Sequence, residues 1–422
     1  MKAGRGTEKK IFNNMVFMYM ILLLLFLAIA GCSSVSDSSS MSAEGTVEEE
    51  SEREDSAGET ENRITADSVT IAELYRDLYE QALQQHTLGS LEMFQAVVSR
   101  LGEHGYAAVD AENENQVNMT HPELLEQFCG LVEEKKEGCV TFLCIMQNGG
   151  FVRFDLETSQ GQVMVTRSVL TWVGGEPEVS YVHQYPAEGW RYSENGYLFF
   201  EEALPEGYDG APGYTAVRVQ PLEETCREFN RKYILPVNYG SNNMFLTDWS
   251  EPDFRGIEFD DLFALLYPYA MGTPMPYEKS VEGGRYMVPE EEYEKVICSY
   301  FSIDKDTLRA QAAYSQQEKG YDYRTRGFYD NAASPNLPYP EVVSYEEKED
   351  GTVTLTVNAV WPQKLMERAF SHEVTVRPDE KGGFRYISNY VTFFAENVEP
   401  EWYTEKFTDE EWNAIYGGED ES

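Results

Sequence analysis

The sequence predicts an α+β protein with two units, each made of helices followed by an antiparallel β-meander. In each half, apolar residues first recur at helical spacing, and the period then changes to two, as in strands. Asn-Gly, Asp-Gly and Gly-Gly pairs stand between the alternating segments, where hairpin turns are expected. The 422 residues, 42% of them hydrophobic, are enough for two globular units.

The first unit is predicted over residues 66–275. A capping-box pattern from Thr70 to Glu73 predicts that a helix begins there. Asn148-Gly149 and Asn195-Gly196 predict two hairpin turns. Apolar periodicity predicts helices at about 70–83, 90–103, 120–132, 221–234 and 260–270, and strands at about 140–147, 152–157, 162–173, 178–185, 190–194 and 197–200.

The second unit is predicted over residues 285–416, after a Pro- and Gly-rich stretch. Pro289 and the glutamates after it predict a helix start, because acidic side chains favour the positive end of the helix dipole. A capping box from Thr408 to Glu411 predicts the last helix, and residues 417–422 are expected to form an acidic tail. A second helix is expected near Asp304, with strands at about 342–347, 353–361, 371–377 and 384–394.

The N-terminus carries the signature of an exported lipoprotein. Four basic residues precede an uncharged, apolar run of 16 residues (15–30), which is shorter than the roughly 20 that span a bilayer. The run ends in Ile29-Ala30-Gly31-Cys32, which resembles a bacterial lipoprotein signal. The resemblance implies that residues 1–31 are a signal peptide and that Cys32 receives the lipid, with palmitate among the expected acyl chains. An ordinary secretory signal or an uncleaved helix is the alternative.

Charge and composition indicate where the folded part would lie. Residues 32–65 are Ser-rich and then acidic, with little to bury, so we expect a disordered tether. Lipid on Cys32 would hold the protein on the outer face of the cell membrane. The net charge of −41, from 74 acidic and 33 basic residues, makes nucleic acid an improbable partner.

Metal and cofactor patterns are absent from the sequence. Apart from Cys32 there are five cysteines, an odd number with no CxxC pair, so we expect buried free thiols. The five histidines lie far apart, and His183 and His372 are each expected to be half-buried in a strand with their polar groups satisfied. The acidic stretch from Asp253 to Asp261 is expected to be a solvated loop, with weak cation binding as the alternative. No catalytic, metal or cofactor residue is predicted.

One segment stands out as a candidate ligand-binding loop. It concentrates aromatic rings and two arginines within a strongly acidic chain: Tyr321, Tyr323, Arg324, Arg326 and Tyr329. Arginine pairs with carboxylates, and flat rings stack on sugars or cations. The alternative is a structural loop whose arginines pair with nearby acids and whose rings cover a sheet.

The segment from Tyr286 to Val391 is similar to the C-terminal part of uncharacterised lipoproteins from Gram-positive, Clostridia-type bacteria. The likeness lies in Val288-Pro289, Tyr300-Phe301-Ser302, Asp306-Thr-Leu-Arg309, Asp350-Gly351, Ser371-His372-Glu-Val-Thr375 and Tyr386-Ile-Ser-Asn389. It covers about a quarter of the chain and implies compartment and class, with no known activity. Helices followed by a curved meander also resemble cystatin-like or nuclear-transport-factor-like rolls, which is a likeness of fold alone.

Together these observations predict a membrane-anchored extracellular lipoprotein that acts as a non-catalytic binding or interaction module. Its partner would be an unidentified extracellular ligand or protein. The alternative is a cell-envelope hydrolase that acts on glycan or peptide through paired carboxylates, whose separation a sequence does not give. A purely structural assembly partner is a third hypothesis.

Overall fold

The computed structural model describes residues 47–111, 114–208, 213–331 and 337–417. The chain divides into two units, the first ending at Glu59 and the second beginning at Thr60. The predicted signal peptide, Cys32 and nearly all of the predicted acidic tail lie outside these residues. Helix α2 (Val47–Glu73) covers the second half of the segment expected to be a disordered tether. Its glutamate, alanine and arginine residues have high helix propensity, which explains the difference.

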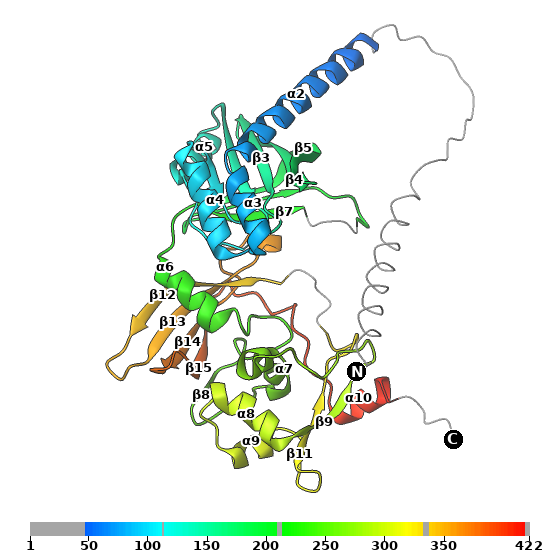
Figure 1. Ribbon diagram of the computed structural model, residues 1–422, viewed down its shortest axis with the longest axis vertical. Helices are drawn as coiled ribbons and strands as arrows, with labels where there is room; N and C mark the ends of the chain where they lie inside the picture. The colour runs from blue at the N-terminus through cyan, green and yellow to red at the C-terminus, as the bar shows by residue number, and fades with distance from the viewer. Residues whose placement is uncertain (1–46, 112–113, 209–212, 332–336, 418–422) are drawn as a thin grey trace, which may run out of the picture. The chain divides into compact units, whose positions relative to one another are not determined.

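A seven-stranded sheet, which includes the strands labelled β3, β4, β5 and β7 in Figure 1, occupies the first part of the second unit. Its spatial order follows the chain from β1 to β7. Strands β1 and β2 are parallel, and all the later neighbours are antiparallel. Strand β5 is long enough to pair with β4 along its first part and with β6 along its last. The strands are β1 (Ala107–Val109), β2 (Gly138–Ile145), β3 (Phe151–Ser159), β4 (Gln162–Val173), β5 (Glu176–Tyr192), β6 (Tyr197–Glu202) and β7 (Tyr214–Arg218).

Helices cover both faces of this sheet. On one face, α5 (Pro122–Glu133) packs over a cluster that includes Phe142. On the other face, α2, α3 (Arg76–Gln85) and α4 (Leu91–Glu103) pack over a cluster that includes Leu143. Alternate residues of a strand point to opposite faces, so the two neighbours Phe142 and Leu143 belong to separate cores.

Two further sheets follow. The five-stranded sheet has the order β12–β13–β14–β15–β8, and the three-stranded sheet has the order β10–β11–β9. Strand β8 precedes the others in the chain, yet Trp249 pairs with Asn389 of β15. The strands are β8 (Trp249–Ser250), β9 (Arg285–Pro289), β10 (Tyr314–Ser315), β11 (Gly320–Arg324), β12 (Tyr339–Glu347), β13 (Val353–Val360), β14 (Ser371–Pro378) and β15 (Phe384–Thr392).

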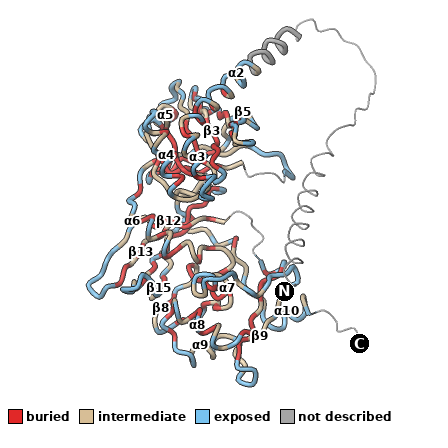
Figure 2. The backbone as a smooth tube through the Cα atoms, viewed as in Figure 1, coloured by how far each residue is buried: buried red, intermediate tan, exposed pale blue. Residues whose placement is uncertain are grey.

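One large hydrophobic cluster, from Leu222 to Trp402, joins these two sheets to the helices around them. Buried residues are concentrated in the central strands and on the inner sides of the helices (Figure 2). Residues before the domain boundary predicted within 272–285 therefore pack with residues after it. The helices are α6 (Glu224–Phe229), the π-helical η1 (Asn230–Ile234), α7 (Phe259–Met271), α8 (Glu290–Tyr300), α9 (Lys305–Gln311), the 3-10 turn η2 (Pro362–Lys364) and α10 (Asp409–Ile415).

The α+β class predicted from the sequence is confirmed, and most of the predicted elements lie where the periodicity places them. The capping box predicted at Thr70 is wrong, because α2 continues to Glu73 and the Thr70 hydroxyl donates to Ala66 O one turn back. The capping box at Thr408 and Glu411 is confirmed. In the described part of the chain, no helix is long and apolar enough to cross a membrane.

Candidate functional site

The predicted ligand-binding loop is divided between the core and the surface. Tyr321 and Tyr323 lie in β11 and are only 1% and 2% exposed. Tyr321 stacks on Tyr293 with ring centroids 4.1 Å apart, and Tyr323 meets Phe263 edge-on at 5.2 Å. These two rings therefore pack in the core, whereas Tyr329 is 65% exposed.

The two arginines of this loop have different environments. Arg326 is buried and forms a bidentate pair with Asp261, with nitrogen–oxygen distances of 3.0 and 2.8 Å. Its remaining nitrogen donates to the carbonyl oxygens of Asp330 and Thr404. Arg324 forms a salt bridge of 2.7 Å with Asp409, whose side chain is largely exposed. Arg326 is thus fully engaged in holding α7 to the segment after β11, whereas Arg324 lies closer to the surface.

The acidic residues at the start of α7, Glu258, Asp260 and Asp261, are paired with basic side chains of the same chain. Glu258 caps the helix, and its carboxylate accepts from the Asp260 backbone N–H. Lys406 is buried and lies 2.8 Å from Asp260, while Arg326 pairs with Asp261. Burial raises the pKa of Asp261, which Arg326 and Lys406 partly oppose. Among the described residues there is no group of three or more His, Cys, Asp and Glu side chains that could hold a metal ion.

A buried polar network joins the first sheet to the five-stranded sheet. Glu341 of β12 accepts from the Tyr197 hydroxyl at 2.6 Å and from Arg218 at 2.7 Å. The Asn115 amide donates to the same carboxylate, and Arg227 donates to Asn115 in turn at 2.7 Å. Burial raises the pKa of Glu341 despite the arginine beside it. The carboxylate of Glu341 is paired with donors from three side chains, although Arg218 Nε has no hydrogen-bond partner, and these contacts give the network a structural character.

Two further titratable groups have strongly shifted pKa values inside the protein. Burial raises the pKa of Asp110 to about 6, although two backbone N–H groups donate to its carboxylate. Burial lowers the pKa of His372 to about 4. The Tyr239 hydroxyl donates to His372 Nε2, and Nδ1 donates to Asn389 Oδ1. Asp110 and His372 are both fully buried and line none of the three cavities described below.

The largest of these cavities is a groove of about 1040 Å³ at one end of the first sheet. We refer to it as the β2–β5 groove, because its lining comes from these four strands and the turns beside them. Its volume is at the upper end of the roughly 300–1,000 Å³ that small-molecule sites occupy. The lining residues are Glu137, Gly138, Cys139, Glu157, Thr158, Ser159, Gly161, Gln162, Val163, Met164, Pro186, Ala187, Glu188 and Trp190.

Strand register explains how the groove is built. Cys139 pairs with Glu157, Glu157 with Met164, and Met164 with Pro186, so these four residues form one row across β2 to β5. Directly paired residues share a face of an antiparallel sheet, and all four residues of the row are exposed. Val163 and Trp190, which also line the groove, belong to the opposite face, where they pack in or against the cluster that includes Phe142. A β-bulge at Ala187–Gly189 interrupts the register between β5 and β6 beside the groove, and such a bulge bends the strand that carries it.

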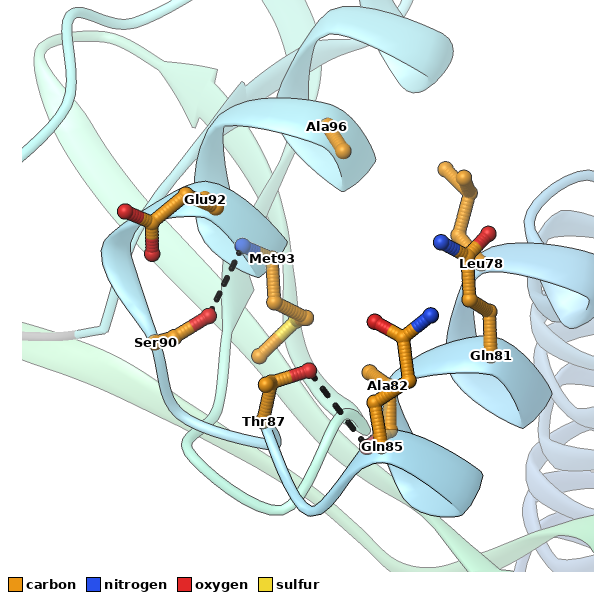
Figure 3. Close-up of a pocket in the computed structure, with 9 residues that line it drawn as sticks. All are labelled: Leu78, Gln81, Ala82, Gln85, Thr87, Ser90, Glu92, Met93 and Ala96. Atoms are coloured by element: carbon orange, nitrogen blue, oxygen red, sulfur yellow. Dashed lines mark hydrogen bonds between the residues drawn. The ribbon is translucent and has the colours of Figure 1, made fainter.

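Two smaller cavities are less suited to a ligand. One has a volume of about 270 Å³ between α3 and α4, where Ala82 and Met93 face each other and the Ser90 hydroxyl caps α4 (Figure 3). The other has about 470 Å³ between the β5–β6 hairpin and the segment after η2. Glu367 in this second cavity already accepts from Ser193 at 2.5 Å and from Asn195 at 2.8 Å.

Sequence reasoning did not identify the β2–β5 groove. Glu137, Glu157 and Glu188 are three of 74 acidic residues, and nothing in their spacing marks them as a set. The signal that was available is the alternation in β3 and β4, which places Glu157 and Met164 on the exposed face of their strands. The row becomes visible only when strand order and register are known.

The fold and the groove define an α+β protein with an acidic cavity on a curled antiparallel sheet. The chain belongs to a family of unknown function (DUF6070), whose model matches residues 61–406. No curated protein and no solved structure matches the chain.

Proposed function

We propose that the protein is a lipoprotein that Cys32 anchors to the outer face of the cell membrane and that its folded part binds a ligand without catalysing a reaction. Support for the anchor is the sequence Ile29-Ala30-Gly31-Cys32 after a short apolar run. The observation that carries the binding function is the β2–β5 groove, an open cavity of about 1040 Å³ with both apolar and charged lining.

A non-catalytic role is supported by the chemistry of the groove. Its lining holds three glutamates, one cysteine and two hydroxyl side chains, and no histidine, lysine or arginine. The carboxyl groups whose pKa burial raises, Asp110, Glu258, Asp261 and Glu341, all lie outside the lining. The alternative of a carboxylate hydrolase stays a prediction, and no contact in the described residues favours it over binding.

Metabolic labelling tests the anchor. The full chain and its Cys32→Ala variant are expressed in a Gram-positive host supplied with radioactive palmitate. We expect label and membrane association only in the wild type, with residues 1–31 missing from its mature N-terminus by mass spectrometry. An unlabelled wild-type protein that retains residues 1–31 would contradict the proposal.

A further inference from the structure

We propose that Lys406 and Asp260 form an intramolecular isopeptide bond, an amide that joins the lysine amine to the side-chain carbonyl carbon of the aspartate. The inference goes beyond the proposed function and rests on neither the lipid anchor nor the β2–β5 groove. It is argued from the burial of the lysine, the contacts of the aspartate and the charged groups around the pair.

Lys406 differs from the other lysines that form salt bridges. Its side chain is only 5% exposed, and its Nζ atom lies 2.8 Å from Asp260 Oδ2, on a side chain that is 12% exposed. In the other lysine salt bridges of the described residues, the lysine side chain is 45% to 64% exposed. Holding two charges away from water is costly, whereas an amide between the same atoms carries no charge.

The two carboxylate oxygens of Asp260 face different groups. Oδ2 faces Lys406, whereas Oδ1 accepts a hydrogen bond of 2.8 Å from the Tyr293 hydroxyl. Tyr293 is fully buried and stacks on Phe263 with ring centroids 4.6 Å apart, so its hydroxyl is held in place. A donor at Oδ1 stabilises the negative charge that this oxygen gains when an amine attacks the carbonyl carbon. Oδ2 is then the oxygen that leaves.

The neighbouring acids explain why Asp260 is the partner. Asp261 is held by Arg326 through both of its oxygens. Glu258 Oε1 lies 3.9 Å from Lys406 Nζ, farther away than the oxygen of Asp260. Glu258 is therefore close enough to accept a proton from the amine, which is the part that a neighbouring carboxylate plays in acid–base catalysis.

The surroundings of Lys406 determine how readily its amine reacts. The ring centroid of Tyr323, a buried side chain, lies 5.8 Å from Nζ. Burial opposes the charged form of Lys406, but three surrounding carboxylates, of which Asp260 has the largest effect, hold its pKa above the ordinary value. The neutral amine is therefore the minor form. We expect the bond to form slowly, once in each molecule, and faster as the pH rises.

The reaction is a condensation in which nothing is oxidised or reduced. A proton first passes from the Lys406 ammonium group to Asp260 Oδ2, which gives a neutral amine and a carboxylic acid. Nζ then attacks Asp260 Cγ, and Glu258 carries a second proton from Nζ to Oδ2. The Nζ–Cγ bond forms, the Cγ–Oδ2 bond breaks, and Oδ2 leaves as water with both protons. Glu258 returns to its starting state.

The bond would join the start of α7 to the segment before α10, two parts of the chain that are 146 residues apart. A cross-link between distant residues stabilises a fold mainly by restricting the unfolded chain. The five cysteines of the described residues are free, so no disulfide has this role among them.

Peptide mapping of the full-length wild-type protein tests the proposal. The protein is denatured in urea and digested with trypsin, which does not cleave after a lysine whose amine is part of an amide. We expect a branched peptide in which residues 256–279 are joined to residues 386–422. Its mass should be the sum of the two peptides less one water molecule, and tandem mass spectrometry should locate the bond at Asp260 and Lys406.

Matched variants separate the covalent bond from the ion pair. Lys406→Arg keeps the positive charge without the amine, and Asp260→Ala removes the carbonyl carbon, so neither should give the branched peptide. Lys305→Arg should give it in the wild-type amount, because Lys305 lies 2.7 Å from Glu294 but is 63% exposed. Thermal unfolding of each variant shows whether the fold is retained.

Two variants test the roles of the groups around the pair. Tyr293→Phe removes the donor to Oδ1 and keeps the stacked ring, and Glu258→Gln removes the group that carries the proton. Each should slow the appearance of the branched peptide by at least about tenfold in freshly purified protein. Unchanged rates in both would contradict this mechanism.

Release of residues 386–406 from the wild type with a free Lys406 amine, even after long incubation of the native protein at alkaline pH, would overturn the proposal. Loss of water confined to residues 256–279 would overturn it as well, because it would indicate a cyclic imide at Asp260 instead of a bond to Lys406. These results are independent of palmitate labelling, so a failure of the cross-link and a failure of the anchor are distinguishable.

Discussion

At the scale of single residues, Arg324 and Arg326 show how two similar side chains differ in energetic importance. Removing one partner of a buried ion pair leaves the other charge unpaired, which costs about 3–5 kcal/mol. Arg326→Ala should therefore lower the free energy of unfolding by that amount, since Asp261 is equally buried. Arg324→Ala should lower it by less than about 1 kcal/mol, because Asp409 is exposed. Urea unfolding measures both, and equal losses would contradict this interpretation.

His372 should make stability depend on pH. Its pKa is about 4 in the folded protein and about 6.5 in the unfolded chain. The unfolded state therefore binds more protons between these values, and stability present above pH 6.5 is lost as the pH falls toward 4. The loss from this group should be roughly 3 kcal/mol.

The comparison that isolates this effect is the unfolding free energy of wild type minus that of His372→Gln, followed from pH 7 to pH 4.5. Asp110 acts in the opposite direction, because its raised pKa favours the folded state as the pH falls toward 4. Its contribution is present in both proteins and cancels in the difference. If the difference in unfolding free energy between the two proteins does not change with pH, His372 is not the origin of the pH-dependent loss of stability.

At the scale of elements, we expect a glycine-to-alanine substitution to have opposite effects on stability at two positions around the first sheet. A Cβ at Gly150, just before β3, would lie 2.2 Å from the Leu170 carbonyl oxygen of β4. Gly150→Ala should therefore force the strands apart and destabilise the fold by more than about 2 kcal/mol. A Cβ at Gly130 in α5 meets nothing within 4 Å, so Gly130→Ala should stabilise by about 0.5–1 kcal/mol. Thermal unfolding compares the two, and stabilisation by Gly150→Ala would exclude the close strand approach.

Local signals explain which elements could be predicted from the sequence. Strand β4 and the turn at Asn148-Gly149 follow from alternation and turn chemistry, and Gly149 has a φ of +80°. Strand β5 was expected as two strands, because its bulge at Ala187–Gly189 interrupts the alternation. Strands β1 and β8 were missed because they are short and depend on partners distant in the chain.

The candidate sites depended even more on distant contacts. The sequence identified the aromatic and arginine-rich segment 321–329, but burial of Tyr321 and Tyr323 depends on α7 and α8, which precede it. The pairing of Arg326 with Asp261 spans 65 residues. Neither contact has a local signal, and the same is true of the row in the β2–β5 groove.

At the scale of the whole molecule, Glu341 should couple the first sheet to the five-stranded sheet. Glu341→Ala leaves Arg218 buried without its carboxylate, so we expect a loss of about 3–5 kcal/mol. Hydrogen exchange should show reduced protection in β6, β7 and β12 together, because the network contacts all three strands. Glu346→Ala, on the exposed side of β12, is the matched control, and a loss confined to β12 would contradict the coupling.

The order of the strands has a consequence for synthesis on the ribosome, during which the N-terminal residues emerge first. Each strand from β2 to β7 pairs with the one made just before it, so this sheet can assemble progressively as the chain appears. Strand β8 does not pair with a strand made just before it. Its partner β15 is synthesised only about 140 residues later. A pause in translation between these two points would leave the edge formed by Trp249 and the apolar residues around it exposed to chaperones and proteases.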